Sequence, residues 1–284
     1  KRERVTMTTT QAPTRDYRGR VHTLSRDIMT DWMAQLKEAT RTPTPSAYLM
    51  ISGNCVEILR CFDILPVFPE INALQLAIRK NSLPYILKSE EIGYASDNCA
   101  YVKADVGFTL CGGVGENGTI PKPSLIVCNF VGCNVYIKWF EHCASMMNVP
   151  MVMLDIPFLR EKTPSKDDIN YVMCQLRELI ATCEKLTGKK FDIDRLREIL
   201  GYSARAERGW ARSKELCKNR PAPFDAYFDS INMMGPINAL RGTKEAAEFF
   251  DAAAAEYEQM VEDGIGALDE ERFRTVVEGP PPYP

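Results

Sequence analysis

The fold is decided by the stretch YLMISGNCVEIL, residues 48–59. Residues 48–51 form a short apolar run, and the turn residues Ser52 and Gly53 follow it. From Val56 onward the spacing of apolar residues is that of a helix. A short apolar run bounded by a turn and followed by helical periodicity is typical of a strand, a loop and a helix in succession. This unit predicts that the chain builds a sheet whose strands are separated by helices.

The same alternation recurs along the chain. A short strand at 65–68 is expected at a sheet edge, because proline is tolerated there and not in a central strand. Strands separated by helices predict the α/β class, with a mainly parallel sheet covered on both faces in three layers. The other expected strands are 124–128 and 150–154, and the expected helices are 25–39, 71–80, 84–93 and 134–147.

Four segments follow from these patterns. Residues 1–45 form an N-terminal arm and helix, and 46–160 form the first α/β domain. Residues 161–272 show helical spacing without a strand and are expected to connect domains. Residues 273–284 resemble the start of a second α/β domain, so the sequence is expected to be part of a longer chain.

Composition and charge restrict the class of protein. The 284 residues carry a net charge of −3, with acidic and basic residues interleaved, which argues against a nucleic-acid-binding face. No window of about 18 apolar residues exists, so no membrane-spanning helix is expected. The start of the chain lacks the apolar run of a signal peptide. A cytoplasmic protein is therefore expected.

Ten cysteines stand out in this composition. No CxxC pair occurs, and without a secretory signal a disulfide framework is not expected. Most free cysteines are small buried apolar residues, and Cys174 and Cys183 fit that interpretation. Cys55 and Cys99 differ, because each lies just before a predicted helix, where backbone N–H groups favour a thiolate and suit an iron–sulfur ligand. Spacing alone leaves packing open for both.

Function is expected beyond the carboxyl ends of the parallel strands. These positions are 52–55, 129–134 and 155–158, where Asp155 is expected to cap a loop. The glycines of 112–118 match neither a dinucleotide fingerprint nor a P-loop, and a flexible loop is expected there. With only two histidines, a histidine metal site or a Ser–His–Asp triad has little support, and His142 is expected to be structural unless it acts as an acid or base.

Several blocks together resemble the benzoyl-CoA reductase and 2-hydroxyacyl-CoA dehydratase family. The similarity runs from about residue 47 to the last residue, and 68–75 with 138–140 look closest to the B-type subunits of benzoyl-CoA reductases. The blocks that carry it are SGNCVEIL with FDILPVFPE (52–70), EIGY to NCAYVK (91–103), CN to LDIP (128–157) and ER to VEGPP (271–281).

The resemblance implies a cofactor and an assembly. Such a subunit would hold a [4Fe–4S] cluster, pair with a homologous second cluster subunit and act on an acyl-CoA thioester in an anaerobic cytoplasm. An activator with its own iron–sulfur cluster, which hydrolyses ATP with Mg²⁺, would supply electrons that come from ferredoxin. By the resemblance, Cys55 and Cys99 are cluster ligands, Cys133 is a reserve ligand, and the third ligand lies outside this sequence.

The resemblance leaves three functions open. The leading hypothesis is an oxidoreductase that reduces the ring of benzoyl-CoA or a similar aryl-CoA. The alternatives are a 2-hydroxyacyl-CoA dehydratase subunit, and an electron-relay or assembly subunit without a substrate site of its own. The candidate proton-transfer residues are Glu57, Tyr101, Lys103 and His142.

Overall fold

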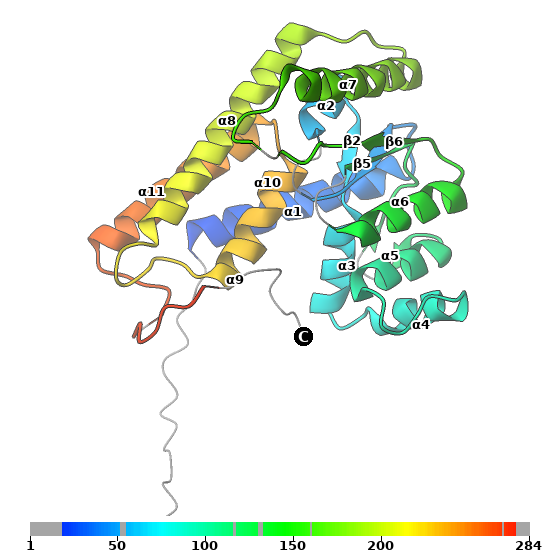
Figure 1. Cartoon of the computed structure of the whole chain (residues 1–284). Helices are drawn as coiled ribbons and strands as arrows, with labels where there is room; N and C mark the ends of the chain where they lie inside the picture. Colours follow the sequence, from blue (N-terminus) through cyan, green and yellow to red (C-terminus); the bar gives the residue numbers. More distant parts are fainter. Residues whose placement is uncertain are drawn as a thin grey trace, which may run out of the picture.

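A central parallel sheet confirms the α/β class (Figure 1). It contains β1 (Ser46–Leu49), β2 (Leu65–Val67), β5 (Leu125–Asn129) and β6 (Met151–Leu154), in the order β2-β1-β5-β6. All neighbouring strands are parallel. The computed structural model describes residues 19–51, 55–115, 118–129, 133–159, 161–268 and 270–276.

The strands were predicted within a few residues of where they lie. All five residues of β5 are buried, as expected for a strand covered on both faces. The predicted edge position of β2 is confirmed, and its Pro66 carbonyl accepts a hydrogen bond of 3.2 Å from the indole of Trp32. The sheet therefore has a proline-containing edge that is covered by the first helix.

Five helices belong to the α/β part of the chain. Two of them, α4 and α5, pack closely, and Gly107 of α5 lies against the backbone of Tyr85 in α4. The glycine stretch predicted as a flexible loop instead pairs two short antiparallel strands, β3 (Val114–Gly115) and β4 (Gly118–Thr119), so that prediction was wrong. The five helices are α2 (Val56–Cys61), α3 (Pro69–Ile78), α4 (Leu83–Glu91), α5 (Ala100–Leu110) and α6 (Asn134–Met147).

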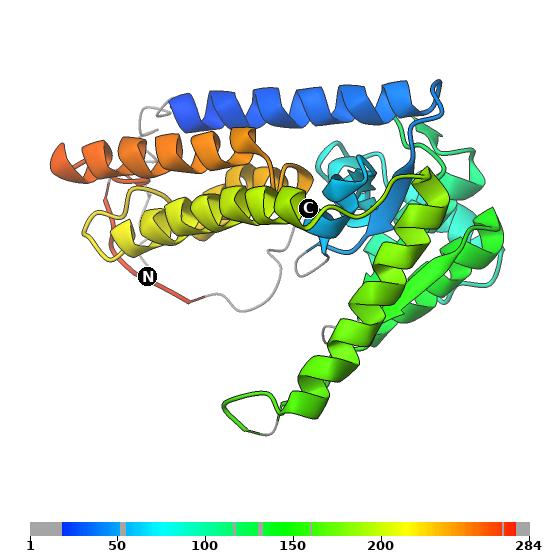
Figure 2. The same cartoon turned by 90° about the horizontal axis from the view of Figure 1, so that it is seen from above.

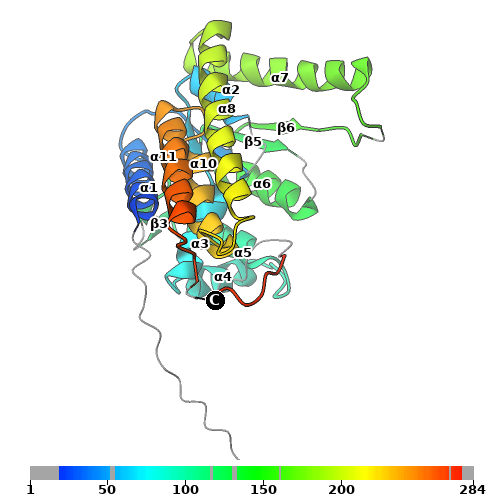
Figure 3. The same cartoon turned by 90° about the vertical axis from the view of Figure 1, so that its left-hand side faces the viewer.

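The remaining regular elements are helical. Helix α1 (Arg20–Ala39) lies alongside α11 (Lys244–Glu262), and α11 packs along α8 (Ile193–Leu216) (Figure 2). Figure 3 shows α7 (Lys166–Thr187) running away from the α8–α11 pair. The connection between α8 and α11 contains α9 (Ala226–Phe228), the π-helical η1 (Asp229–Met233) and α10 (Met234–Ala239).

Caps fix where the long helices begin. Ser165 and Asp168 form a reciprocal capping box at the start of α7, and the Asp192 side chain accepts N–H groups at the start of α8. Cys183 of α7 is buried as predicted, whereas Cys174 is exposed, so its assignment as a packing residue was wrong. Because α7 buries only one of its faces, two cysteines nine positions apart have different environments.

The end of the described chain is irregular. Residues 270–276 contain no strand, and the rest of the strand expected from residue 273 lies outside the described residues. The start of a second α/β domain stays a prediction. Within the described residues, no helix is long and apolar enough to cross a membrane.

Candidate functional site

Three of the predicted site residues occupy the same position relative to a helix. Cys55, Cys99 and Cys133 are the N-cap residues of α2, α5 and α6. Cys55 and Cys133 follow β1 and β5, whose carboxyl ends lie at one edge of the parallel sheet. N-cap positions place a side chain beside free backbone N–H groups. Residues 52–54 and 130–132, predicted as part of this edge, lie outside the described residues.

The three thiols differ in exposure. Cys99 and Cys133 are exposed, whereas Cys55 is half-buried and has a left-handed backbone with φ of 55°. Burial and the charge of Glu57 raise the pKa of the Cys55 thiol to about 11, although the Arg241 guanidinium acts in the opposite direction. Without a metal ion, Cys55 therefore stays a neutral thiol at neutral pH.

Tyr136 links the two exposed thiols. Its pKa is raised first by burial and by the carboxylate of Glu70, and then by the charges of Cys133 and Cys99. Both thiols therefore lie near the same phenol, although they are 34 positions apart in sequence. The structure thus places Cys99 and the reserve candidate Cys133 near one side chain of α6, whereas the predicted pair was Cys55 and Cys99.

Glu70 completes this group. Its carboxylate accepts hydrogen bonds from the Tyr136 hydroxyl and from the backbone N–H of Ile51, and both bonds lower a pKa that burial raises. The second carboxylate oxygen, Oε2, is buried and has no hydrogen-bond partner within the described residues. Glu70 can therefore hold a proton at Oε2 while its other oxygen stays fixed by the end of β1 and by α6.

Neither Glu70 nor Tyr136 was among the predicted site residues. The sequence does carry a signal for Glu70, because it follows Phe68-Pro69 directly after an edge strand and so lies at a strand end. Tyr136 lies only three residues after Cys133, on the helix whose start was predicted to lie near the site. Strand ends at this edge of a parallel sheet are where ligands bind, and both residues could have been found from that rule.

The predicted proton-transfer residues are held in structural contacts. The buried Glu57 accepts hydrogen bonds from Ser203 at 2.8 Å and from the Arg241 guanidinium at 2.6 Å. The buried Lys103 donates to Glu90 at 2.8 Å and to the carbonyl of Ser96 at 2.6 Å. Lys103 thus holds the loop that leads to Cys99 by hydrogen bonds. Glu57 connects the helix that follows Cys55 to Ser203 and Arg241 in the helical part.

The other two candidates lie on helices that pack against the sheet domain. His142 of α6 hydrogen-bonds through Nδ1 to the Tyr94 hydroxyl, and the two rings stack with centroids 5.6 Å apart. Tyr101 is half-buried against Ala73, Leu76, Ala104 and Phe108. A role of these residues in proton transfer stays a prediction.

A loop at the end of β6 is fastened to α7. The Asp155 carboxylate accepts a hydrogen bond from the Tyr171 hydroxyl at 2.8 Å, and its backbone N–H donates to Gln175 at 2.6 Å. These contacts give Asp155 the loop-capping position that the sequence indicated.

Comparison with known proteins identifies the relatives of this chain. Residues 52–284 match the family model described as 2-hydroxyglutaryl-CoA dehydratase, D-component. The chain belongs to this family. The B subunit of benzoyl-CoA reductase from Thauera aromatica is 40% identical over 240 residues, which are 81% of this chain and 56% of that protein. The predicted resemblance to benzoyl-CoA reductases and 2-hydroxyacyl-CoA dehydratases is confirmed.

Dehydratase subunits are also among the relatives of this chain. The (R)-phenyllactyl-CoA dehydratase alpha subunit of Clostridium sporogenes is 34% identical, over 78% of this chain and 54% of that protein. The alpha subunit of (R)-2-hydroxyglutaryl-CoA dehydratase from Acidaminococcus fermentans is 34% identical over 58% of this chain and 35% of that protein. The chain spans about half the length of most relatives it matches.

The cysteines of this chain fit part of the ligand set of an iron–sulfur cluster. Such clusters are bound by cysteine thiolates and are tuned by hydrogen bonds to their sulfur atoms. Two exposed thiols at helix starts supply the ligand type and neighbouring N–H donors. Within the described ranges, however, no group of three or more histidine, cysteine, aspartate or glutamate residues could hold a metal ion. A cluster here would therefore need at least one further ligand.

Proposed function

We propose that this chain is a subunit of an oxygen-sensitive [4Fe–4S] enzyme that reduces the aromatic ring of benzoyl-CoA or a similar aryl-CoA. The observation that supports a cluster best is the grouping of the exposed Cys99 and Cys133 thiols around Tyr136. The reductase is favoured over a dehydratase by the 40% identity to the B subunit of benzoyl-CoA reductase, against 33% and 34% for dehydratase subunits.

In this proposal Cys55 and Cys99 are cluster ligands, Cys133 is the reserve ligand, and a further ligand comes from outside this sequence. The cluster would supply single electrons at low potential. The chain's own residues would position the site: Lys103 fixes the loop before Cys99, and the start of α6 carries Cys133 and Tyr136.

Glu70 and Tyr136 are the groups best placed to manage a proton. The raised pKa of Glu70 favours its protonated form, with the proton on the buried Oε2. The Tyr136 hydroxyl stays protonated because burial and neighbouring negative charges raise its pKa. Ring reduction consumes protons, and the Glu70 carboxyl, which is hydrogen-bonded to Tyr136, could deliver one when it is protonated.

The proposal includes partners. A homologous second cluster subunit, an activator that carries its own iron–sulfur cluster and hydrolyses ATP with Mg²⁺, and ferredoxin as electron donor would complete the system. The relatives are themselves named as B and alpha subunits, which supports a multi-subunit assembly. An anaerobic cytoplasm would protect the cluster from oxygen.

The cluster is tested by anaerobic iron and sulfide analysis with EPR on the complex that contains the full-length chain. Cys99→Ser should lose about one [4Fe–4S] equivalent, because a ligand thiolate is removed. Cys183→Ser is the matched control, since Cys183 is fully buried in the core and should leave the iron content unchanged. Unchanged iron in Cys99→Ser, Cys55→Ser and Cys133→Ser alike would reject the ligand assignment.

A 2-hydroxyacyl-CoA dehydratase is the second candidate, because the family model and several relatives are dehydratases. The purified complex should be assayed with benzoyl-CoA and with phenyllactyl-CoA. Loss of water from phenyllactyl-CoA without ring reduction of benzoyl-CoA would replace the leading proposal by this one.

The third candidate is a relay or assembly subunit. Its test is a difference spectrum of the cluster on addition of benzoyl-CoA. A substrate-site cluster should respond to the thioester, whereas a relay cluster should not.

A further inference from the structure

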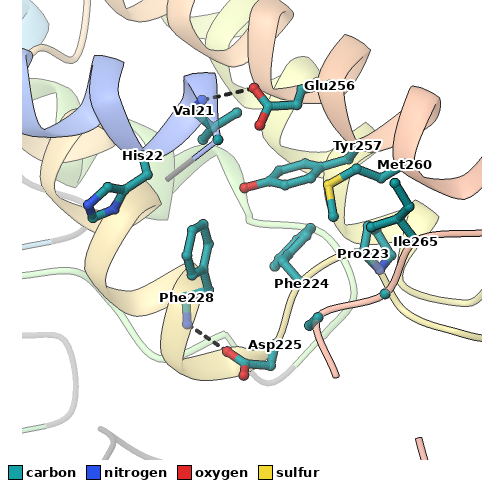
Figure 4. A pocket seen from close by; sticks show the side chains of 13 residues that line it. Val21, His22, Pro223, Phe224, Asp225, Phe228, Glu256, Tyr257, Met260 and Ile265 are labelled. Atoms are coloured by element: carbon teal, nitrogen blue, oxygen red, sulfur yellow. Dashed lines mark hydrogen bonds between the residues drawn. The ribbon is translucent and has the colours of Figure 1, made fainter. Parts of the chain in front are cut away.

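A cavity of about 180 Å³ lies in the helical part of the chain, outside the cysteine site. Figure 4 shows its walls, which come from the start of α1, the residues before and within α9, and the second half of α11. None of the cysteines, nor Glu70 or Tyr136, lines it. A function for this cavity is therefore independent of the cluster and of the proposed reaction.

The cavity is lined mainly by apolar and aromatic side chains. Phe224 and Tyr257 pack with ring centroids 4.6 Å apart and their planes tilted by 34°, and Phe228, Val21 and Met260 face the same space (Figure 4). An apolar protein cavity of about 150 Å³ is large enough to bind benzene. The size and the lining both suit a single aromatic ring.

One polar group in the wall has no partner. The Tyr257 side chain is 2% exposed, and its hydroxyl has no hydrogen-bond partner among the described residues. Figure 4 shows this hydroxyl pointing into the space between Val21, His22 and Phe228. Burial raises the pKa of Tyr257, so the group remains a hydrogen-bond donor at neutral pH.

The neighbouring polar groups are already bonded. Glu256 accepts the backbone N–H of Val21 at 2.9 Å, and Asp225 accepts the backbone N–H of Phe228 at 2.8 Å. His22 shares a hydrogen bond of 2.9 Å with the Asn232 side chain. Among the described lining residues, Tyr257 is thus the side-chain donor that lacks a partner.

The charges of the wall select against anions. Glu256 and Asp225 contribute carboxylates, and the described lining residues include neither lysine nor arginine. An anionic ligand would meet like charges, and none of the described lining residues would offer it a cation. The ligand should therefore be neutral.

We propose that this cavity is a binding site for a neutral compound with one aromatic ring and a hydrogen-bond acceptor, such as an aryl ketone or aryl amide. The ring lies among Phe224, Phe228 and Tyr257. The acceptor oxygen takes the hydrogen bond from the Tyr257 hydroxyl after the half-buried side chains of His22 and Phe228 move aside, because the hydroxyl is closed off in this structure. This pairing satisfies the buried donor and fills the apolar space at the same time.

Fluorine NMR titrations of the full chain in its purified complex test the site with three probes: 4-fluoroacetophenone, 4-fluorotoluene and 4-fluorobenzoate. The wild type should bind the ketone saturably, the hydrocarbon more weakly, and the anion not at this site. Tyr257→Phe should weaken ketone binding by roughly tenfold and leave hydrocarbon binding unchanged, because only the hydroxyl is lost.

Two further variants make the result specific. Tyr202→Phe changes a half-buried tyrosine of α8 that does not line the cavity, and should bind all probes as the wild type does. Ile265→Trp enlarges a wall residue and should remove binding of both neutral probes. The proposal is overturned if the wild type binds neither neutral probe saturably, or if Tyr257→Phe binds the ketone unchanged or loses both probes equally.

Discussion

The α/β part and the helical part of this chain use small residues for different purposes. In the helical part, Gly209 allows α8 to approach α11, since a Cβ there would lie 2.8 Å from the backbone of Phe250. In the α/β part, Gly107 brings α5 even closer to α4, with a Cβ position 1.9 Å from the Tyr85 carbonyl oxygen. The first contact holds a helix pair together, whereas the second positions the helix that begins at Cys99.

Their cysteines differ in position along the helices. The exposed Cys99 and Cys133 begin helices of the α/β part, whereas in the helical part Cys174 and Cys183 lie within α7 and Cys217 ends α8. The difference teaches that the α/β part presents exposed thiols at helix starts, and that the helical part supplies a packed support with a separate cavity.

The largest effect should come from Gly107→Ala. Its added methyl group would overlap the backbone of α4, and backbone cannot rotate away as a side chain can. We expect a loss of roughly 3 kcal/mol in the free energy of unfolding, measured by urea denaturation. Gly209→Ala should cost less, about 1–2 kcal/mol, because its contact is 0.9 Å less severe. Equal losses in the two variants would contradict the expected difference between the α4–α5 contact and the α8–α11 contact.

A smaller effect is expected where the two parts are joined. Glu57 of α2 is buried and pairs with Arg241, which follows α10, at 2.6 Å. Arg241→Met leaves the carboxylate without its nearest cation and should cost about 2–3 kcal/mol in stability, because an unpaired buried charge is unfavourable. Chemical denaturation of the variant measures this loss.

The control for that variant is Arg205→Met, which breaks the exposed pair with Asp251 within the helical part. It should cost less than about 1 kcal/mol, as exposed ion pairs do. Adding Glu57→Gln to Arg241→Met should recover part of the loss. If Arg205→Met proved as costly as Arg241→Met, the buried pair would have no special role in joining the parts.

Much of the fold could be predicted from the sequence, because its signals are local. The apolar run at 124–128 and the helical spacing at 134–147 place β5 and α6 almost to the residue. The β3–β4 hairpin was missed because strands of two residues carry no periodicity. The exposure of Cys174 was missed because it depends on which face of α7 meets the sheet.

The site was predicted less completely, since it depends on contacts between distant segments. Helix-start positions for Cys55 and Cys99 follow from local pattern, and the structure confirms them. The hydrogen bond between Glu70 and Tyr136 joins residues 66 positions apart, and no local pattern encodes it. The ion pair of Glu57 is a similar case, because its partner lies 184 positions away.

A pH dependence should distinguish the α/β part. Asp105 of α5 is fully buried, accepts a hydrogen bond from the Trp139 indole at 3.0 Å, and has its pKa raised by burial to about 7. In the unfolded chain the carboxyl titrates near its ordinary pKa of 3.8, so between these two values the folded state holds more protons. Stability should therefore fall as the pH rises from about 4 to 7, and should then level off.

Asp105→Asn tests this effect. The variant cannot ionise, so it should lack this part of the pH dependence and should gain stability relative to the wild type as the pH rises from 5 to 8. Thermal unfolding at pH 5 and pH 8 measures the difference. Parallel pH profiles of the two proteins would show that Asp105 is ionised in the folded state.

The smallest effect is expected from Gly201→Ala in α8. A Cβ at this exposed position meets no atom within 4 Å, in contrast to Gly209 two turns further along the same helix. Alanine has the higher helix propensity, so the free energy of unfolding should rise by about 0.5–1 kcal/mol. Urea denaturation of Gly201→Ala and Gly209→Ala should give changes of opposite sign. A loss of stability in both would mean that α8 is covered on the face of Gly201 as well, and the helical part would then have a second buried surface.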